Sequence, residues 1–246
     1  MVYITEPTWS NHELLFESLD FRVHKLPYYK NGAFDFSAYM KTLKLAITGS
    51  VIVLHTCAHN PTGCDPTRAQ WKQIASVIRD RGLFPIFDSA YLGFNSGSVD
   101  EDAWAIRYFV EDFGLEVAVA LSFAKNMGLY GERIGMVAFV TKTSQTAKKV
   151  SSILENVQRA TVSSPVVYGA QIVSTILGDT QISKQWAMDL ITMSTRIQTM
   201  RQRLYEQLVR LQTPGDWSHV TRQTGMFGYI GISSSQIQHL QSKFTT

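Results

Sequence analysis

Hydrophobic residues along the chain form two kinds of pattern that alternate. Short runs rich in Val, Ile, Phe and Tyr, with turn residues nearby, are typical of strands. Six such runs occur, at residues 1–4, 21–29, 50–57, 82–88, 116–123 and 133–140. Several are apolar on both faces, as in a parallel sheet covered by helices. The pattern therefore predicts an α/β fold with a mostly parallel sheet.

Helical periodicity fills the segments between these runs. Four apolar residues between the third and fourth predicted strands share one helix face: Trp71, Ile74, Ala75 and Ile78. We expect Asp65 to cap this helix, Pro66 to lie in its first turn and Gly82 to close it. Further helices are predicted over residues 100–114 and 146–160.

The second part of the chain contains one long, mostly polar helical pattern. It covers residues 181–212 and stops at Pro214. A stripe of apolar residues follows helical spacing within it: Met193, Ile197, Met200, Leu204, Leu208 and Leu211. Packing against the rest of the protein is the simplest interpretation of such a stripe.

After this helix, the sequence predicts the start of a second unit. Residues 219–232 have the pattern of a strand of a new sheet, and residues 233–244 that of a helix. We therefore predict a large domain over residues 1–190 and the beginning of a smaller domain over residues 191–246.

The composition excludes several classes of protein. The chain has 246 residues, 45% hydrophobic and 17% charged, with a net charge of +3 and no long run of Lys and Arg. These values argue against a nucleic-acid-binding protein. No apolar run approaches the roughly 20 residues needed to span a bilayer, and the start of the chain does not resemble a signal peptide. Two cysteines, Cys57 and Cys64, favour a reduced, intracellular compartment.

Chemically distinctive residues follow three of the predicted strands. Asn60 follows the third strand, Asp88 and Tyr91 the fourth, and Lys125 the fifth. Ligands of open α/β sheets bind at the carboxyl ends of strands, so these side chains should converge. One interpretation is a buried Lys125–Asp88 salt bridge. The other is pyridoxal phosphate, which needs a lysine for its imine and an acid opposite its ring nitrogen.

A second group of side chains could in principle hold a metal. His55, Cys57 and His59 alternate along a strand and so share one face. We interpret this face as packed beneath the site and predict no metal.

Six stretches decide between these interpretations. In chain order they are "PTWSNH", "LHTCAHNPTGCDPTRAQWKQIA", "FPIFDSAYLGFNSG", "DAWAIRYFV", "SFAKNMGLYGERIG" and "TPGDWSHVTRQTGMFGYIG". Together they resemble the aspartate aminotransferases, class I pyridoxal-phosphate enzymes of fold type I, and the resemblance covers essentially the whole chain. It implies transfer of the amino group of L-aspartate to 2-oxoglutarate, giving oxaloacetate and L-glutamate. It also implies a homodimer and a cytoplasmic or mitochondrial location.

The resemblance also assigns roles at the cofactor ring. Lys125 matches the Schiff-base lysine, which also carries protons, and Asp88 matches the partner of the ring nitrogen. Asn60 and Tyr91 match the donors to the ring oxygen, and Trp9 matches the tryptophan that stacks on the ring. Trp9 and Asn60 would also contact the substrate.

Three further residues match the ends of the cofactor and of the substrate. Ser122 and Arg133 match ligands of the phosphate. Arg159 matches an arginine that reaches into the neighbouring subunit and grips the side-chain carboxylate of the substrate. Two departures from the family pattern are Ala124, where a phosphate-binding serine is common, and Ser164, where asparagine is expected.

The resemblance further leads us to expect a fragment. The family's N-terminal phosphate loop and its C-terminal arginine for the substrate's α-carboxylate have no counterpart in these 246 residues. The alternative to an active enzyme is therefore a catalytically incompetent form that at most associates with a full-length subunit.

Overall fold

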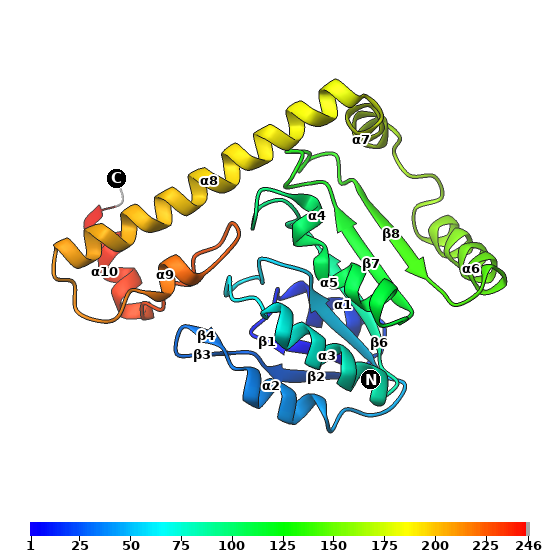
Figure 1. Ribbon diagram of the computed structural model, residues 1–246, viewed down its shortest axis with the longest axis horizontal. Coiled ribbons are helices and arrows are strands. Elements are labelled where there is room, and N and C mark those ends of the chain that lie inside the picture. The colour runs from blue at the N-terminus through cyan, green and yellow to red at the C-terminus, as the bar shows by residue number, and fades with distance from the viewer. Residues whose placement is uncertain (245–246) are drawn as a thin grey trace.

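A computed structural model describes residues 1–244 of the chain and contains a central six-stranded sheet (Figure 1). The strand order is β2-β1-β5-β6-β7-β8, and every pair is parallel except β7 with β8. The strands are β1 (Val2–Glu6), β2 (Val23–Pro27), β5 (Val51–His55), β6 (Phe84–Ser89), β7 (Val117–Ser122) and β8 (Gly135–Val140). The predicted α/β fold with a mostly parallel sheet is confirmed. A two-stranded hairpin, β3 (Tyr29–Lys30) with β4 (Ala33–Phe34), stands apart from it.

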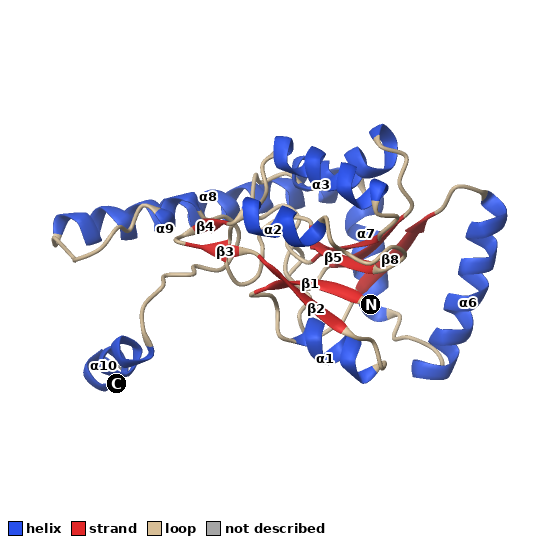
Figure 2. Ribbon diagram, turned by 90° about the horizontal axis from the view of Figure 1, so that it is seen from below, coloured by secondary structure: helices blue, strands red, loops and turns tan. Residues whose placement is uncertain are grey.

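Helices cover both faces of this sheet. In Figure 2, α2 (Phe36–Leu43) and α3 (Arg68–Asp80) lie on one side and α1 (Asn11–Ser18) on the other. The predicted apolar face of α3 is buried in the main core. Its Trp71 ring lies 6.1 Å from Phe87 of β6 and 5.9 Å from Phe109, measured between ring centroids. This packing fixes α3 against the middle of the sheet.

The start of α3 differs from the prediction. Thr67, not Asp65, is the N-cap, and Thr67 and Gln70 form a reciprocal capping box. The Asp65 carboxylate turns away and accepts hydrogen bonds from the backbone amides of Ala58 and His59, at 2.7 and 2.9 Å. Asp65 therefore stabilises the turn after β5 instead of the helix.

The helix predicted over residues 100–114 is broken into three short pieces. These are α4 (Val99–Asp102), α5 (Trp104–Arg107) and a π-helical turn, η1 (Tyr108–Asp112). Asp102 ends the first piece, and its carboxylate accepts hydrogen bonds from the amides of Gly93 and Asn95. The helix predicted over residues 146–160 is confirmed as α6 (Ser144–Val162).

A 31-residue helix, α8 (Thr180–Arg210), follows the shorter α7 (Tyr168–Gly178) and extends beyond the sheet in both views (Figures 1 and 2). The apolar stripe is only partly packed: Met193, Met200 and Leu204 are 37–40% exposed, and Leu211 is 68% exposed. The buried residues of α8 are instead Leu190, Ser194 and Arg201. Every helix in the described part of the chain is too short or too polar to cross a membrane.

The strand predicted over residues 219–232 is also wrong. The segment begins with a short helix, α9 (His219–Arg222), and continues as an irregular loop. A strand needs a neighbouring strand for its backbone hydrogen bonds, and residues 1–244 place none beside this segment. The helix predicted over residues 233–244 is confirmed as α10 (Ser234–Phe244).

The division into two domains stays a prediction. Helix α8 runs without a break through residues 190 and 191, the predicted boundary. The last two residues of the predicted small domain, 245–246, lie outside the described residues.

Candidate functional site

The carboxyl ends of β5, β6 and β7 bring an amide, a phenol and an amine together. The Asn60 side-chain amide donates a hydrogen bond to the Tyr91 hydroxyl at 3.2 Å. The Lys125 ammonium lies 5.1 Å from the centre of the Tyr91 ring. Burial raises the pKa of Tyr91 to about 12, against the lowering effect of Asn60, so Tyr91 keeps its proton at neutral pH. The convergence predicted from the strand ends is present.

Asp88 lies in the same site but is bound by a histidine. Its Oδ2 atom accepts a hydrogen bond from Nε2 of His12 at 3.0 Å. Lys125 is half-buried, and no ion pair joins it to Asp88 among the residues that the structure describes. The interpretation of the two residues as a direct salt bridge is therefore wrong.

The charge state of Asp88 follows from this arrangement. Burial alone would raise the pKa of its carboxyl group. The hydrogen bond from His12, together with the neighbouring His55 and Lys125, outweighs burial and lowers the pKa below its ordinary value of 3.8. The site therefore contains a mostly buried carboxylate that is ionised at neutral pH.

His12 belongs to a chain of partly buried hydrogen bonds that the sequence did not reveal. Its Nδ1 atom lies 2.9 Å from the hydroxyl of Thr8, which lies 3.0 Å from Nε2 of His55. Burial lowers the pKa of His55 to about 4, so this ring is neutral at pH 7. The sequence offered one signal, because His12 lies within the stretch "PTWSNH" that resembles the family.

The predicted face of His55, Cys57 and His59 is largely packed. Both ring nitrogens of His59 have hydrogen-bond partners, the hydroxyls of Thr5 and Thr62. Burial lowers the pKa of His59 well below its ordinary value.

A different trio has the spacing of metal ligands. One ligand atom each from His12, His55 and Asp88 lies within 4.8 Å of the others. His12 hydrogen bonds directly to Asp88 and through the Thr8 hydroxyl to His55, so hydrogen bonds already hold the three side chains together.

The remaining predicted residues make contacts of their own. Trp9 is 47% exposed, and its ring meets that of His12 edge-on at 5.5 Å, so it lies at the rim of the site. Ser122 ends β7, and its hydroxyl accepts a hydrogen bond from the Ala124 amide. Arg133 is exposed and donates to the Tyr130 carbonyl at 3.0 Å.

Arg159 is not part of this cluster. It lies on the exposed helix α6, at the opposite side of the molecule from α10 (Figure 1). Within one chain, the structure therefore joins Trp9, Asn60, Asp88, Tyr91 and Lys125 but not Arg159.

The fold and this site define the class of protein. The sequence matches the family of class I and II aminotransferases over residues 1–245, and the chain belongs to this family. It is 47% identical over 245 residues to the cytoplasmic aspartate aminotransferase of Schizosaccharomyces pombe, covering 99% of this chain and 60% of that protein. It is 46% identical to the chloroplastic aspartate aminotransferase 3 of Arabidopsis thaliana, covering 99% of this chain and 54% of that protein.

Solved structures of aminotransferases have the same fold as this chain. The broad-specificity aminotransferase of Leishmania mexicana superposes with a TM-score of 0.95 at 40% identity, over 98% of this chain and 60% of that one. The aromatic-amino-acid aminotransferase of Burkholderia pseudomallei, solved covalently bound to pyridoxal phosphate, gives 0.96 at 38% identity, over 99% and 61%. The chain thus spans about 60% of the length of most of these relatives.

Proposed function

We propose that this chain acts in a pyridoxal-phosphate-dependent aminotransferase that converts L-aspartate and 2-oxoglutarate to oxaloacetate and L-glutamate. The supporting observation is the meeting of Lys125, Asp88 and the Asn60–Tyr91 pair at the ends of three parallel strands. The aspartate preference draws on four relatives named as aspartate aminotransferases, to which the chain is 44–47% identical.

The donor set of the site fits pyridoxal phosphate. A half-buried amine, an ionised carboxylate and a phenol paired with an amide are the groups that its aldehyde, ring nitrogen and ring oxygen require. When bound, the cofactor supplies an electron sink for negative charge at the substrate α-carbon. The residues that would hold it are Lys125, Asp88, Asn60, Tyr91, Trp9, Ser122 and Arg133.

The protein's own contribution is to orient groups and to set their charges. His12 keeps Asp88 ionised, so that Asp88 holds a proton on the ring nitrogen opposite it. The Lys125 amine carries the proton at the substrate α-carbon. Trp9, at the rim, covers the site and excludes water. Arg159 would recognise the side-chain carboxylate of the substrate as a bidentate fork.

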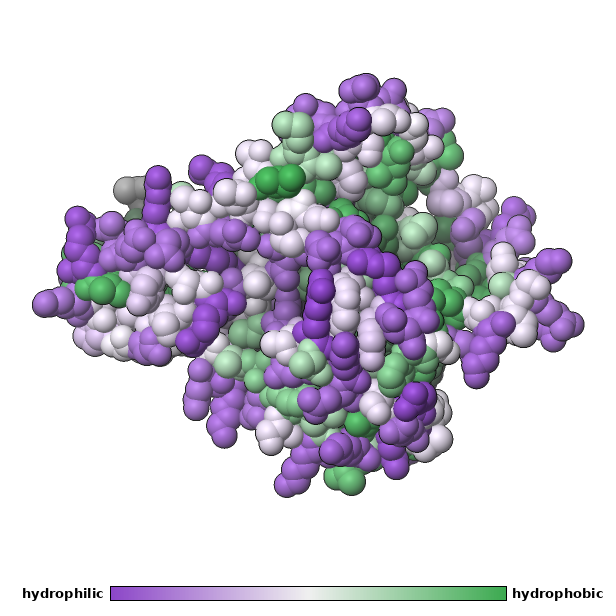
Figure 3. All heavy atoms as spheres, viewed as in Figure 1, coloured by the Kyte–Doolittle hydropathy of each residue, from purple (hydrophilic) through white to green (hydrophobic). Residues whose placement is uncertain are grey.

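A homodimer is part of this proposal, because the assigned role of Arg159 requires a second subunit. Exposed apolar side chains lie on β8, along α6 and from there to the first residue of α7: Met136, Val137, Ile153, Val157, Val162, Val166, Val167 and Tyr168. Figure 3 shows hydrophobic surface between α6 and α7. Exposed apolar surface of this kind favours association. We also propose a cytoplasmic location, as in the yeast relative.

The test is to identify the lysine that binds pyridoxal phosphate covalently. The protein is incubated with pyridoxal phosphate and reduced with borohydride, and the modified peptide is identified by mass spectrometry. We expect the adduct on Lys125 and its loss in Lys125→Ala, whereas the control Lys148→Ala, on exposed α6, keeps it. Oxaloacetate formation from aspartate is measured in parallel. An adduct that persists in Lys125→Ala contradicts the proposal, and an adduct on Lys125 without turnover favours the catalytically incompetent alternative.

A further inference from the structure

Arg201 is a buried arginine that lacks an acidic partner. It lies in the middle of α8 and is 9% exposed, and none of the ion pairs among residues 1–244 includes it. Burial lowers its pKa. An apolar side chain of similar size would often stabilise such a position at least as well. The role of the guanidinium is therefore to donate hydrogen bonds.

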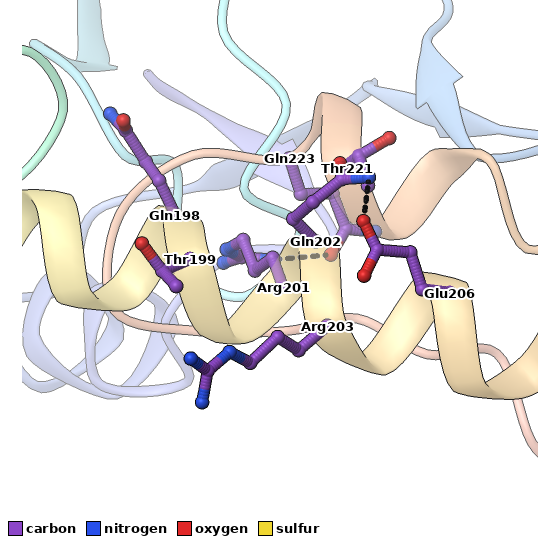
Figure 4. Close-up of a pocket in the computed structure, with 8 residues that line it drawn as sticks. All are labelled: Gln198, Thr199, Arg201, Gln202, Arg203, Glu206, Thr221 and Gln223. Atoms are coloured by element: carbon purple, nitrogen blue, oxygen red, sulfur yellow. Dashed lines mark hydrogen bonds between the residues drawn. The ribbon is translucent and has the colours of Figure 1, made fainter.

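Those hydrogen bonds go to backbone carbonyls of α9 and of the irregular segment that follows it. The acceptors are the carbonyl oxygens of Val220, Thr224, Gly225 and Phe227. We call residues 223–227 the clamp loop. Figure 4 shows Arg201 reaching from α8 toward Gln223, whose side-chain oxygen lies 3.5 Å from Nη1. Because no strand among residues 1–244 pairs with this loop, the arginine satisfies carbonyls that a sheet would otherwise bind.

The other side of the clamp loop contacts the turn that carries Asn60. The Thr224 amide donates to the Gly63 carbonyl at 2.8 Å, and the Thr224 hydroxyl donates to the Asp65 carboxylate at 2.9 Å. Asp65 in turn binds the two backbone amides that precede Asn60. At Gly225, an added Cβ would lie 2.2 Å from the Ala58 Cβ, so the two segments are in direct contact.

The clamp loop also contacts the second member of the Asn60–Tyr91 pair. The ring of Phe227 meets the ring of Tyr91 edge-on, with 5.5 Å between centroids. The loop that Arg201 binds therefore supports Asn60 through Asp65 and Tyr91 through Phe227.

We propose that Arg201 is a positioning residue for Asn60 and Tyr91 and acts on them through the clamp loop. The inference rests on the proposed function, in which this pair donates hydrogen bonds to the ring oxygen of pyridoxal phosphate. Without the guanidinium, the loop carbonyls lose their donors and the loop leaves its contacts with Asp65 and Tyr91. The pair then stabilises the anionic ring oxygen less well, which raises the pH midpoint of the absorbance change of the bound cofactor.

The test is a pH titration of the visible absorbance of the cofactor bound to Arg201→Met. We expect the midpoint to rise by about one pH unit, because losing one hydrogen bond to a charged oxygen costs about as much free energy as a shift of one pKa unit. The matched control is Arg203→Met, which removes an exposed arginine from the same helix and should leave the midpoint unchanged. Arg201→Lys should shift it by an intermediate amount, because an ammonium lacks the fork that reaches several carbonyls.

A second pair of variants tests the loop directly if Arg201→Met fails to fold. Thr224→Val removes the hydroxyl that binds Asp65, and Thr221→Val removes an exposed hydroxyl that binds only the Ser218 carbonyl. Only Thr224→Val should raise the midpoint. If Arg201→Met binds the cofactor with an unchanged midpoint, the role of Arg201 is overturned but the proposed function is not. If Arg201→Met does not fold, an unchanged midpoint in Thr224→Val has the same meaning. A parent protein that binds no pyridoxal phosphate overturns the proposed function and this inference together.

Discussion

Lowering the pH from 7 to 4.5 should destabilise the folded protein through His55. Burial is the main reason that the pKa of His55 falls from 6.5 to about 4, although the nearby Asp88 acts in the opposite direction. The unfolded chain therefore binds this proton first as the pH falls. The contribution of His55 to stability is complete above pH 6.5 and is lost as the pH falls from 6.5 toward 4.

The size of the effect follows from the two pKa values. Each pKa unit corresponds to about 1.4 kcal/mol, so the lowered pKa corresponds to about 3.5 kcal/mol in total. At pH 4.5, about 2.5 kcal/mol of this has been lost. Asp88 contributes little in this window, because its lowered pKa places its own protonation below pH 4. His59 acts in the same direction as His55, since burial lowers its pKa as well.

The variant His55→Gln isolates the contribution of His55 to the pH dependence of stability. Glutamine retains a group that can hydrogen bond to the Thr8 hydroxyl and does not titrate. Urea unfolding of the cofactor-free protein is measured at pH 7 and 4.5. Between these values the variant should lose about 2.5 kcal/mol less free energy of unfolding than the parent. The control His239→Gln, on the exposed surface of α10, should follow the parent. If His55→Gln and the parent show the same pH dependence, burial does not set the charge of His55 and the reasoning is refuted.

Three further predictions concern the core, a close contact and specificity. Trp71→Ala should lower the free energy of unfolding by about 3–5 kcal/mol in urea, whereas the exposed Gln73→Ala should change it by no more than about 0.5 kcal/mol. Gly225→Ala should lower the melting temperature, because its φ of 74° and its contact with Ala58 leave no room for a Cβ. Adding Ala58→Gly should restore part of the loss, and a double variant no more stable than the single one would exclude this contact as the cause. Arg159→Ala should reduce kcat/KM for aspartate and glutamate by about two to three decades more than for neutral amino acids. Equal losses for both groups would make Arg159 structural.

The parts of the fold that could be predicted are those that local sequence determines. Strands apolar on both faces indicated a covered, mostly parallel sheet, and the face of α3 followed from the spacing of its apolar residues. The meeting of Asn60, Asp88, Tyr91 and Lys125 could be predicted for a geometric reason. Parallel strands end at one edge of a sheet, so residues that follow such strands lie close together whatever their separation in sequence.

The predictions were wrong where the local sequence allows two structures and tertiary contacts determine which of them forms. Asp65 and Thr67 are both good helix caps, and the choice of Thr67 depends on the turn amides and on Thr224, which hold the Asp65 carboxylate elsewhere. The partner of Asp88 is 76 positions away at His12, and only the packing of α1 on the sheet brings them together. Residues 219–232 have the composition of a strand, but composition does not show whether a neighbouring strand exists.

The hydrogen bond between Thr224 and Asp65 has a consequence for biosynthesis. It joins residues that are 159 positions apart. At about 5–20 residues per second, a ribosome adds Thr224 roughly 8–32 s after Asp65. During that interval the turn that carries Asn60 lacks its contact with the clamp loop. The cofactor site can therefore reach its final geometry only after Thr224 has been added, when all six strands of the described sheet have already been made.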